Sequence, residues 1–202
     1  GDNGKIYRVT AAGADPQNSV LFDSADTHVI SLAVDAAGNL YAGTDPGGVV
    51  IRFGRDRKPF ALLDSPLREI HAIAPAADGS VYVLAIGDST SAPAASPSAT
   101  PSATPEQKPI AVKKRAAATP EPAPKSRYDL GGVRSAIYRI TAAGEDSLIW
   151  TSPSVTAFSL LAEPTGVLVG TADKGRVYRV RNDGGETLLT QSDARQISTL
   201  TA

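Results

Sequence analysis

A serine that follows a pair of apolar residues recurs four times and marks a repeat along the chain. The serines are Ser24, Ser65, Ser152 and Ser192, separated by 41, 87 and 40 residues in that order. After the first three, a polar link leads into an apolar run, a glycine, a second apolar run and a Tyr-Arg or Ile-Arg step. A repeat of about 40–45 residues with four short strands is typical of β-propeller blades. The repeat therefore favours an all-β fold built from similar sheets.

One repeat unit shows four strands, which we label A to D in chain order. In the second blade the expected ranges are 29–35, 39–44, 49–53 and 59–63. β-branched and aromatic residues in short, partly alternating runs favour strands. Gly-Asn and Pro-Gly-Gly between the runs supply the backbone conformations that tight hairpins need. No stretch shows a helical period with caps.

The same pattern divides the whole chain. Residues 1–86 hold strands C and D of a first blade, a whole second blade and strands A and B of a third. Residues 87–134 form an insert in the B–C hairpin of the third blade. Residues 135–202 hold strands C and D of the third blade, a whole fourth blade and strand A of the next. We predict a propeller of four-stranded antiparallel blades, either partial or closed into a small ring by the last strand A.

The chain is expected to be a fragment of a longer protein. It begins and ends in mid-blade and contains 0 Met. Three blades plus pieces are fewer than the four to eight that close a ring, and open sheet edges tend to pair with other strands. We therefore expect the remaining blades of a parent chain as one partner.

The insert differs from the rest of the chain in composition. It is rich in Pro, Ala, Ser and Thr and has almost no bulky apolar residues. Such a segment cannot bury enough surface to offset its ordering entropy, so we predict disorder. Its similarity to linkers of exported bacterial proteins favours a periplasmic or secreted location.

Charge and cysteine content exclude several classes of protein. The chain has 20 Lys and Arg against 21 Asp and Glu, a formal net charge of −1. A dedicated nucleic-acid binder would carry a basic excess. No apolar run reaches the 18 residues of a membrane span. The absence of Cys excludes disulfides and thiolate metal sites.

The end of each blade where strand A begins is the expected binding face. Strand A begins where strand B ends, so the D–A link and the B–C turn share this end. The second link position is polar in each blade, which could supply convergent hydrogen bonds to a small molecule or a protein; the alternative is that link residues are polar because they face water. The candidate ligand-binding residues are His28, Arg68, Glu69, Thr156, Arg195 and Gln196 from the links, with Asp45, Asp173 and Lys174 from the B–C turns.

The two histidines and a recurring arginine are the other notable side chains. His28 and His71 are offset by two positions on adjacent blades, and no zinc site is predicted because no carboxylate pair accompanies them. We expect Glu69 to point to the face of its strand opposite His71. The arginines of strand C are expected to cover apolar neighbours and to pair at the sheet surface; they are Arg8, Arg52, Arg139 and Arg179.

Known catalytic motifs are missing from the sequence, but a family resemblance is present. There is no nucleophile elbow, phosphate-binding loop, dinucleotide fingerprint or HExxH motif. The pattern AxDxxGNLYAGT…GxVYRV, at 33–44 in the second blade and 166–180 in the fourth, resembles bacterial β-propellers of the NHL, YVTN and two-component-regulator type. The Gly-His and Trp-Asp marks of WD40 repeats are absent. The resemblance implies the fold, whose members bind, scaffold, sense or hydrolyse lactones and esters.

The leading functional hypothesis is a non-enzymatic binding or scaffold module without a cofactor, whose channel end recognises a protein or a small ligand. One alternative is a calcium-dependent, lactonase-like hydrolase with Glu69 and Asp45 as the first calcium ligands. Another is a purely structural repeat segment of a larger surface protein.

Overall fold

The computed structural model describes residues 4–10, 17–24, 28–87, 128–172 and 174–201. In these residues the chain forms one two-stranded sheet and three four-stranded sheets, all antiparallel. No helix in this part of the chain is long and apolar enough to span a membrane. Most of the predicted insert, 88–127, lies outside the described residues.

Each sheet is a meander of consecutive strands, as expected for a propeller blade. The first holds β1 (Gly4–Thr10) and β2 (Gln17–Ser24). The second holds β3 (His28–Val34), β4 (Leu40–Asp45), β5 (Val49–Phe53) and β6 (Pro59–Asp64). The third holds β7 (Glu69–Pro75), β8 (Val81–Ile86), β9 (Ser135–Ile140) and β10 (Asp146–Ser152). The fourth holds β11 (Ala157–Glu163), β12 (Gly166–Thr171), β13 (Arg176–Arg181) and β14 (Glu186–Gln191).

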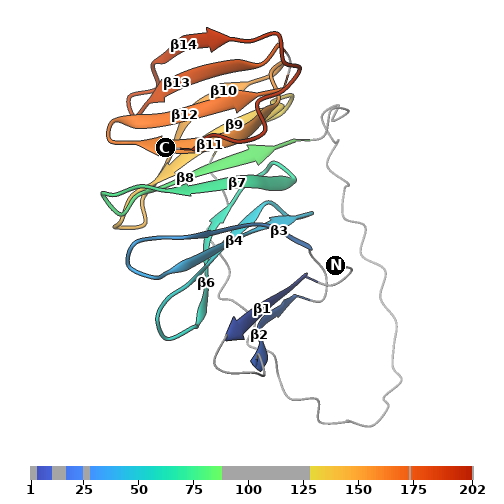
Figure 1. The fold of residues 1–202 in the computed structure, drawn as a ribbon, viewed down its shortest axis with the longest axis vertical. Coiled ribbons are helices and arrows are strands. Elements are labelled where there is room, and N and C mark those ends of the chain that lie inside the picture. The colour runs from blue at the N-terminus through green and yellow to red at the C-terminus, as the bar shows by residue number, and fades with distance from the viewer. Residues whose placement is uncertain (1–3, 11–16, 25–27, 88–127, 173, 202) are drawn as a thin grey trace, which may run out of the picture.

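The sheets follow one another in an open array (Figure 1), with the β1–β2 sheet at one end and the β11–β14 sheet at the other. Strands A of the blades, β3, β7 and β11, contact one another in neighbouring sheets, whereas β6, β10 and β14 are the outermost strands. This arrangement confirms the partial propeller. The small closed ring is not formed in the described residues, because β1 pairs only with β2 and this sheet lies at the opposite end of the array from β11–β14.

The core lies between facing sheets. Tyr82 and Ile137 of the third blade pack with Val167, Val169 and Val180 of the fourth, and each is at most 1% exposed. A similar cluster joins the second and third blades. Strands buried on both faces explain why runs such as 81–86 read as continuously apolar.

Strand A carries an irregularity at the same position in each complete blade. The register shifts between Val29 and Ser31 in β3, around His71 in β7 and around Phe158 in β11. A bulge bends its strand and redirects a side chain. The bulges therefore present Ile30, His71 and Phe158 from equivalent sites on neighbouring blades.

The strand A predicted at the end of the chain is wrong as a strand. None is formed in the described residues 195–201. Ile197 nevertheless donates its backbone N–H to the carbonyl of Thr171, and its own carbonyl accepts from Ser159 Oγ at 2.9 Å. The equivalent bond between the second and third blades runs from Ser31 Oγ to the carbonyl of Ile70, at 2.7 Å. The segment thus occupies the position of a strand A, but without a strand B beside it no ladder forms.

The last residues of the predicted insert pack against the third blade. Leu130 is 6% exposed and belongs to the core between the second and third blades. Tyr128 Oη accepts a hydrogen bond from the backbone N–H of Leu148 at 3.2 Å. Residues 128–134 are therefore part of the folded blade.

Candidate functional site

The D–A links and B–C turns meet at one end of the array, which we call the D–A end. His28, the first residue of β3, pairs with Asp45, the last of β4. Arg68 in the next link donates from Nε to Asp45 Oδ1 at 2.8 Å. The structure thus brings two predicted site residues from a turn and a link into an ion pair. Because the Arg68 side chain is half exposed, the pair contributes little to stability.

Thr156 has a comparable contact one blade further on. Arg134, just before β9, lies with Nη1 at 3.4 Å from Thr156 Oγ1, and the Thr156 carbonyl accepts from the Ala172 N–H. Link residues therefore tie neighbouring loops together, and this accounts for part of their polarity.

Glu69 and His71 form the closest pair of titratable side chains at this end. His71 Nδ1 lies 2.5 Å from Glu69 Oε1, and the side chains are 27% and 31% exposed, respectively. The prediction that they point to opposite faces is wrong, because residues two apart in a strand share a face. An ionised carboxylate can only accept, so Nδ1 carries the proton of this bond. In the neutral ring Nε2 is then an acceptor.

Phe158 completes this group from the next blade. Its ring meets the His71 ring edge to face, with 5.0 Å between centroids and 85° between planes. Both residues occupy the strand A bulges, so the repeated backbone sets their approach. Phe158 is not among the site residues predicted from the sequence. The repeat could have indicated it, because Phe158 follows His71 by 87 residues, the same separation as between Ser65 and Ser152.

Four other predicted residues lie at the same end without joining this group. His28, Lys174, Arg195 and Gln196 are exposed. Lys174 has a positive φ of 63° in the turn between β12 and β13. Asp173 lies outside the described residues. The four exposed side chains form a solvated rim.

The described residues contain no group of three or more His, Cys, Asp and Glu side chains arranged to hold a metal ion. The two carboxylates named for calcium already have partners, Asp45 in Arg68 and Glu69 in His71. Each contact uses one of the two carboxylate oxygens, Asp45 Oδ1 and Glu69 Oε1.

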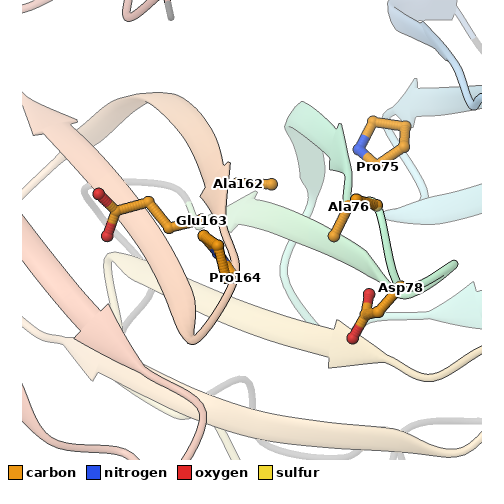
Figure 2. Close-up of a pocket in the computed structure, with 7 residues that line it drawn as sticks. Pro75, Ala76, Asp78, Ala162, Glu163 and Pro164 are labelled. Atoms are coloured by element: carbon orange, nitrogen blue, oxygen red, sulfur yellow. The ribbon is translucent and has the colours of Figure 1, made fainter.

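A shallow hollow of about 270 Å³ lies at the opposite end, between the A–B turns of the third and fourth blades. Figure 2 shows Asp78 and Glu163 on separate turns at its two sides, with Ala76 and Ala162 between them. Each carboxylate binds an arginine of its own blade: Arg139 Nη2 lies 3.0 Å from Asp78, and Arg179 Nε lies 2.7 Å from Glu163. The recurring arginine of strand C thus holds an A–B turn acid in these two blades. In the second blade, Arg52 instead lies over the Phe60 ring, 5.6 Å from its centroid.

Two carboxylates in A–B turns have lowered pKa values, from which the change of stability with pH can be predicted. Hydrogen bonds from the Ser80 hydroxyl and N–H, followed by Arg139, lower the pKa of Asp78 below 3.8. Burial opposes ionisation of Asp35, but bonds from Asn39 and Tyr41 outweigh it and lower its pKa too. A folded-state pKa below the unfolded one stabilises the fold at neutral pH, and this stabilisation is lost as pH falls through the folded value.

We therefore expect the melting temperature to fall as pH drops below about 5. Ser80→Ala should destabilise the protein at pH 7 and flatten this acid-dependent fall, because it removes a donor to Asp78. Thermal scans at pH 7, 5, 4 and 3 test both statements. An unchanged acid slope in the variant would contradict them.

The fold is that of known β-propellers. No protein-family model matches the chain, and no curated protein matches its sequence. A chain of the nidogen/laminin complex superposes with a TM-score of 0.59 at 11% identity, covering 98% of this chain and 62% of its own length. Luciferin-regenerating enzyme superposes with a TM-score of 0.57 at 14% identity, covering 98% of this chain and 59% of the enzyme. Virginiamycin B lyase from Staphylococcus aureus superposes with a TM-score of 0.58 at 13% identity, covering 95% of this chain and 51% of the lyase. The chain thus spans between half and two thirds of these structures, and the likeness shows the fold alone.

Proposed function

We propose that this chain is a binding module whose ligand site lies at the D–A end, around His71. The observation that carries the proposal is the contact of three side chains on two blades: Glu69 holds Nδ1 of His71, and Phe158 fixes the ring from the side. Nε2 has no hydrogen bond in the described residues, and the side chain is 27% exposed. Ligand-binding sites commonly combine an aromatic surface with a few polar groups that fix the orientation of the ligand.

The chemistry of this group indicates a class of ligand. A neutral His71 with its proton on Nδ1 offers Nε2 to an N–H or O–H donor. Phe158 offers an aromatic contact next to it. We therefore expect a small molecule or an exposed protein side chain with a donor attached to an apolar ring, such as an indole or a phenol.

The solved neighbours are compatible with binding and with catalysis. One is a chain of the nidogen/laminin complex, and the other two are named as enzymes. Binding is favoured over calcium-dependent hydrolysis because Asp45 and Glu69 are both engaged by neighbouring side chains.

The test uses 4-hydroxybenzamide and indole as probes, titrated into the isotope-labelled chain while NMR shifts are followed. We expect saturable shifts centred on His71 and Phe158 with dissociation constants near the millimolar range, as suits ligands of this size. His71→Phe should abolish them, because it keeps the ring and removes the acceptor. His28→Phe is the matched control, since it changes an exposed histidine at the same end.

The proposal fails if neither probe shifts these residues, or if both variants bind equally well. Thermal scans of the two variants exclude unfolding as the cause of a lost response.

A further inference from the structure

In the described residues the first sheet has two strands, at the positions of strands C and D, and no strand at the positions of A and B. β1 carries the Ile-Tyr-Arg step of strand C, and in the complete blades strand C pairs on both sides, as β9 does with β8 and β10. In the described residues β1 pairs only with β2. Its second edge therefore presents a row of backbone donors and acceptors that can add a strand.

A groove of about 430 Å³ lies between β1 and the second blade. Leu32 and Val34 of β3 line it and are 56% and 64% exposed. The residues aligned with Leu32 in the next two blades, Ile73 and Leu160, are partly buried against the core shared with the preceding blade. Leu32 and Val34 thus hold the positions that make this contact in the other blades, and they are available to a pair of strands that enters the groove.

The charge at the groove favours a particular kind of turn in strands that bind there. Arg8 lines it, is exposed, and aligns with Arg139 and Arg179. Those two arginines bind carboxylates from the A–B turns of their own blades, Asp78 and Glu163. Arg55 and Arg57 add further positive charge at the rim. An acidic turn is the complement of this arrangement.

We propose that this groove binds a two-stranded antiparallel β-hairpin of the A–B type, with apolar residues on one face and a carboxylate at its turn. One strand of the hairpin adds to the free edge of β1, its apolar face covers Leu32 and Val34, and its turn acid pairs with Arg8. The interface continues the blade-to-blade packing seen along the array and is independent of the ligand site at His71.

The test uses a fluorescent peptide of residues 155–172, which contains the chain's own hairpin β11–β12 with Glu163 at the turn, extended by lysines for solubility. We expect saturable binding by anisotropy and slowed amide exchange in β1. Leu32→Asp in the protein should weaken binding at least tenfold. Leu189→Asp is the matched control, because Leu189 is 43% exposed on β14 at the far end of the array.

A charge exchange tests the orientation of the hairpin. A peptide with Glu163→Arg should bind the wild-type protein about two- to fivefold more weakly, as expected for an exposed ion pair, and should recover with Arg8→Glu protein. Equal binding to Leu32→Asp and Leu189→Asp proteins would overturn the proposal. So would a concentration-dependent dimer that Leu32→Asp dissociates while the peptide fails to bind, since this would assign the groove to a second copy.

Discussion

Replacing Gly43 by alanine is expected to lower the free energy of unfolding by about 1–3 kcal/mol, the usual cost of overpacking a filled interior. A Cβ at this position would lie 2.3 Å from Ser31 Oγ and 2.5 Å from Ile70 Cγ2. Ser31 could rotate away only by losing its bond to the Ile70 carbonyl. Two blades would therefore have to separate around a single methyl group.

Urea denaturation followed by circular dichroism measures this change. Gly131→Ala is the control, because its Cβ would meet only Asp129 Oδ1, at 3.4 Å. Gly170→Ala repeats the experiment against Ser159 and Ile197 at 2.3 and 2.6 Å. We expect a smaller loss there, since the segment at Ile197 is not held in a sheet and can move. Equal stability of the Gly43 and Gly131 variants would show that the blade contact is looser than described.

Replacing Ile137 by alanine is expected to cost about 2–5 kcal/mol, the range for large-to-small changes in a filled core. Ile137 is 0% exposed in the cluster between the third and fourth blades. The loss combines the transfer free energy of the removed methyl groups with that of the cavity. Because sheets on both sides use this core, it should appear in the main cooperative transition.

Ile30→Ala is the matched control, because it deletes the same atoms from a strand residue that is 44% exposed. It should stay within about 0.5 kcal/mol of wild type, as surface substitutions usually do. Calorimetry of the two variants measures the difference. A similar loss in both would contradict the assignment of Ile137 to the shared core.

The local elements were predictable from the sequence because they depend on neighbouring residues. Strand C of the second blade was expected at 49–53 and is observed as Val49–Phe53. Alternating apolar residues and turn glycines act over a few positions, so each repeat reports its own strands. The propeller followed from the repeat of those strands, with no long-range contact needed to recognise it.

Long-range contacts decided what the sequence pattern left open or got wrong. The predicted placement of Glu69 away from His71 was an error of strand geometry. The repeat aligns Phe158 with His71, but the contact of their rings depends on bulges that the sequence pattern does not predict. Leu130 was assigned to a low-complexity insert, yet its environment is set by a core from two other blades.

The sequence by itself determined the repeat, the strand order within each blade and the polar character of the D–A end, because these follow from local periodicity. Only the tertiary structure decided how the described sheets follow one another, that Arg68 forms an ion pair with Asp45, and that the described residues leave one edge of β1 without a partner strand beside Leu32 and Val34. These features depend on how successive sheets pack and rotate, and that is a property of surfaces brought together from distant parts of the chain.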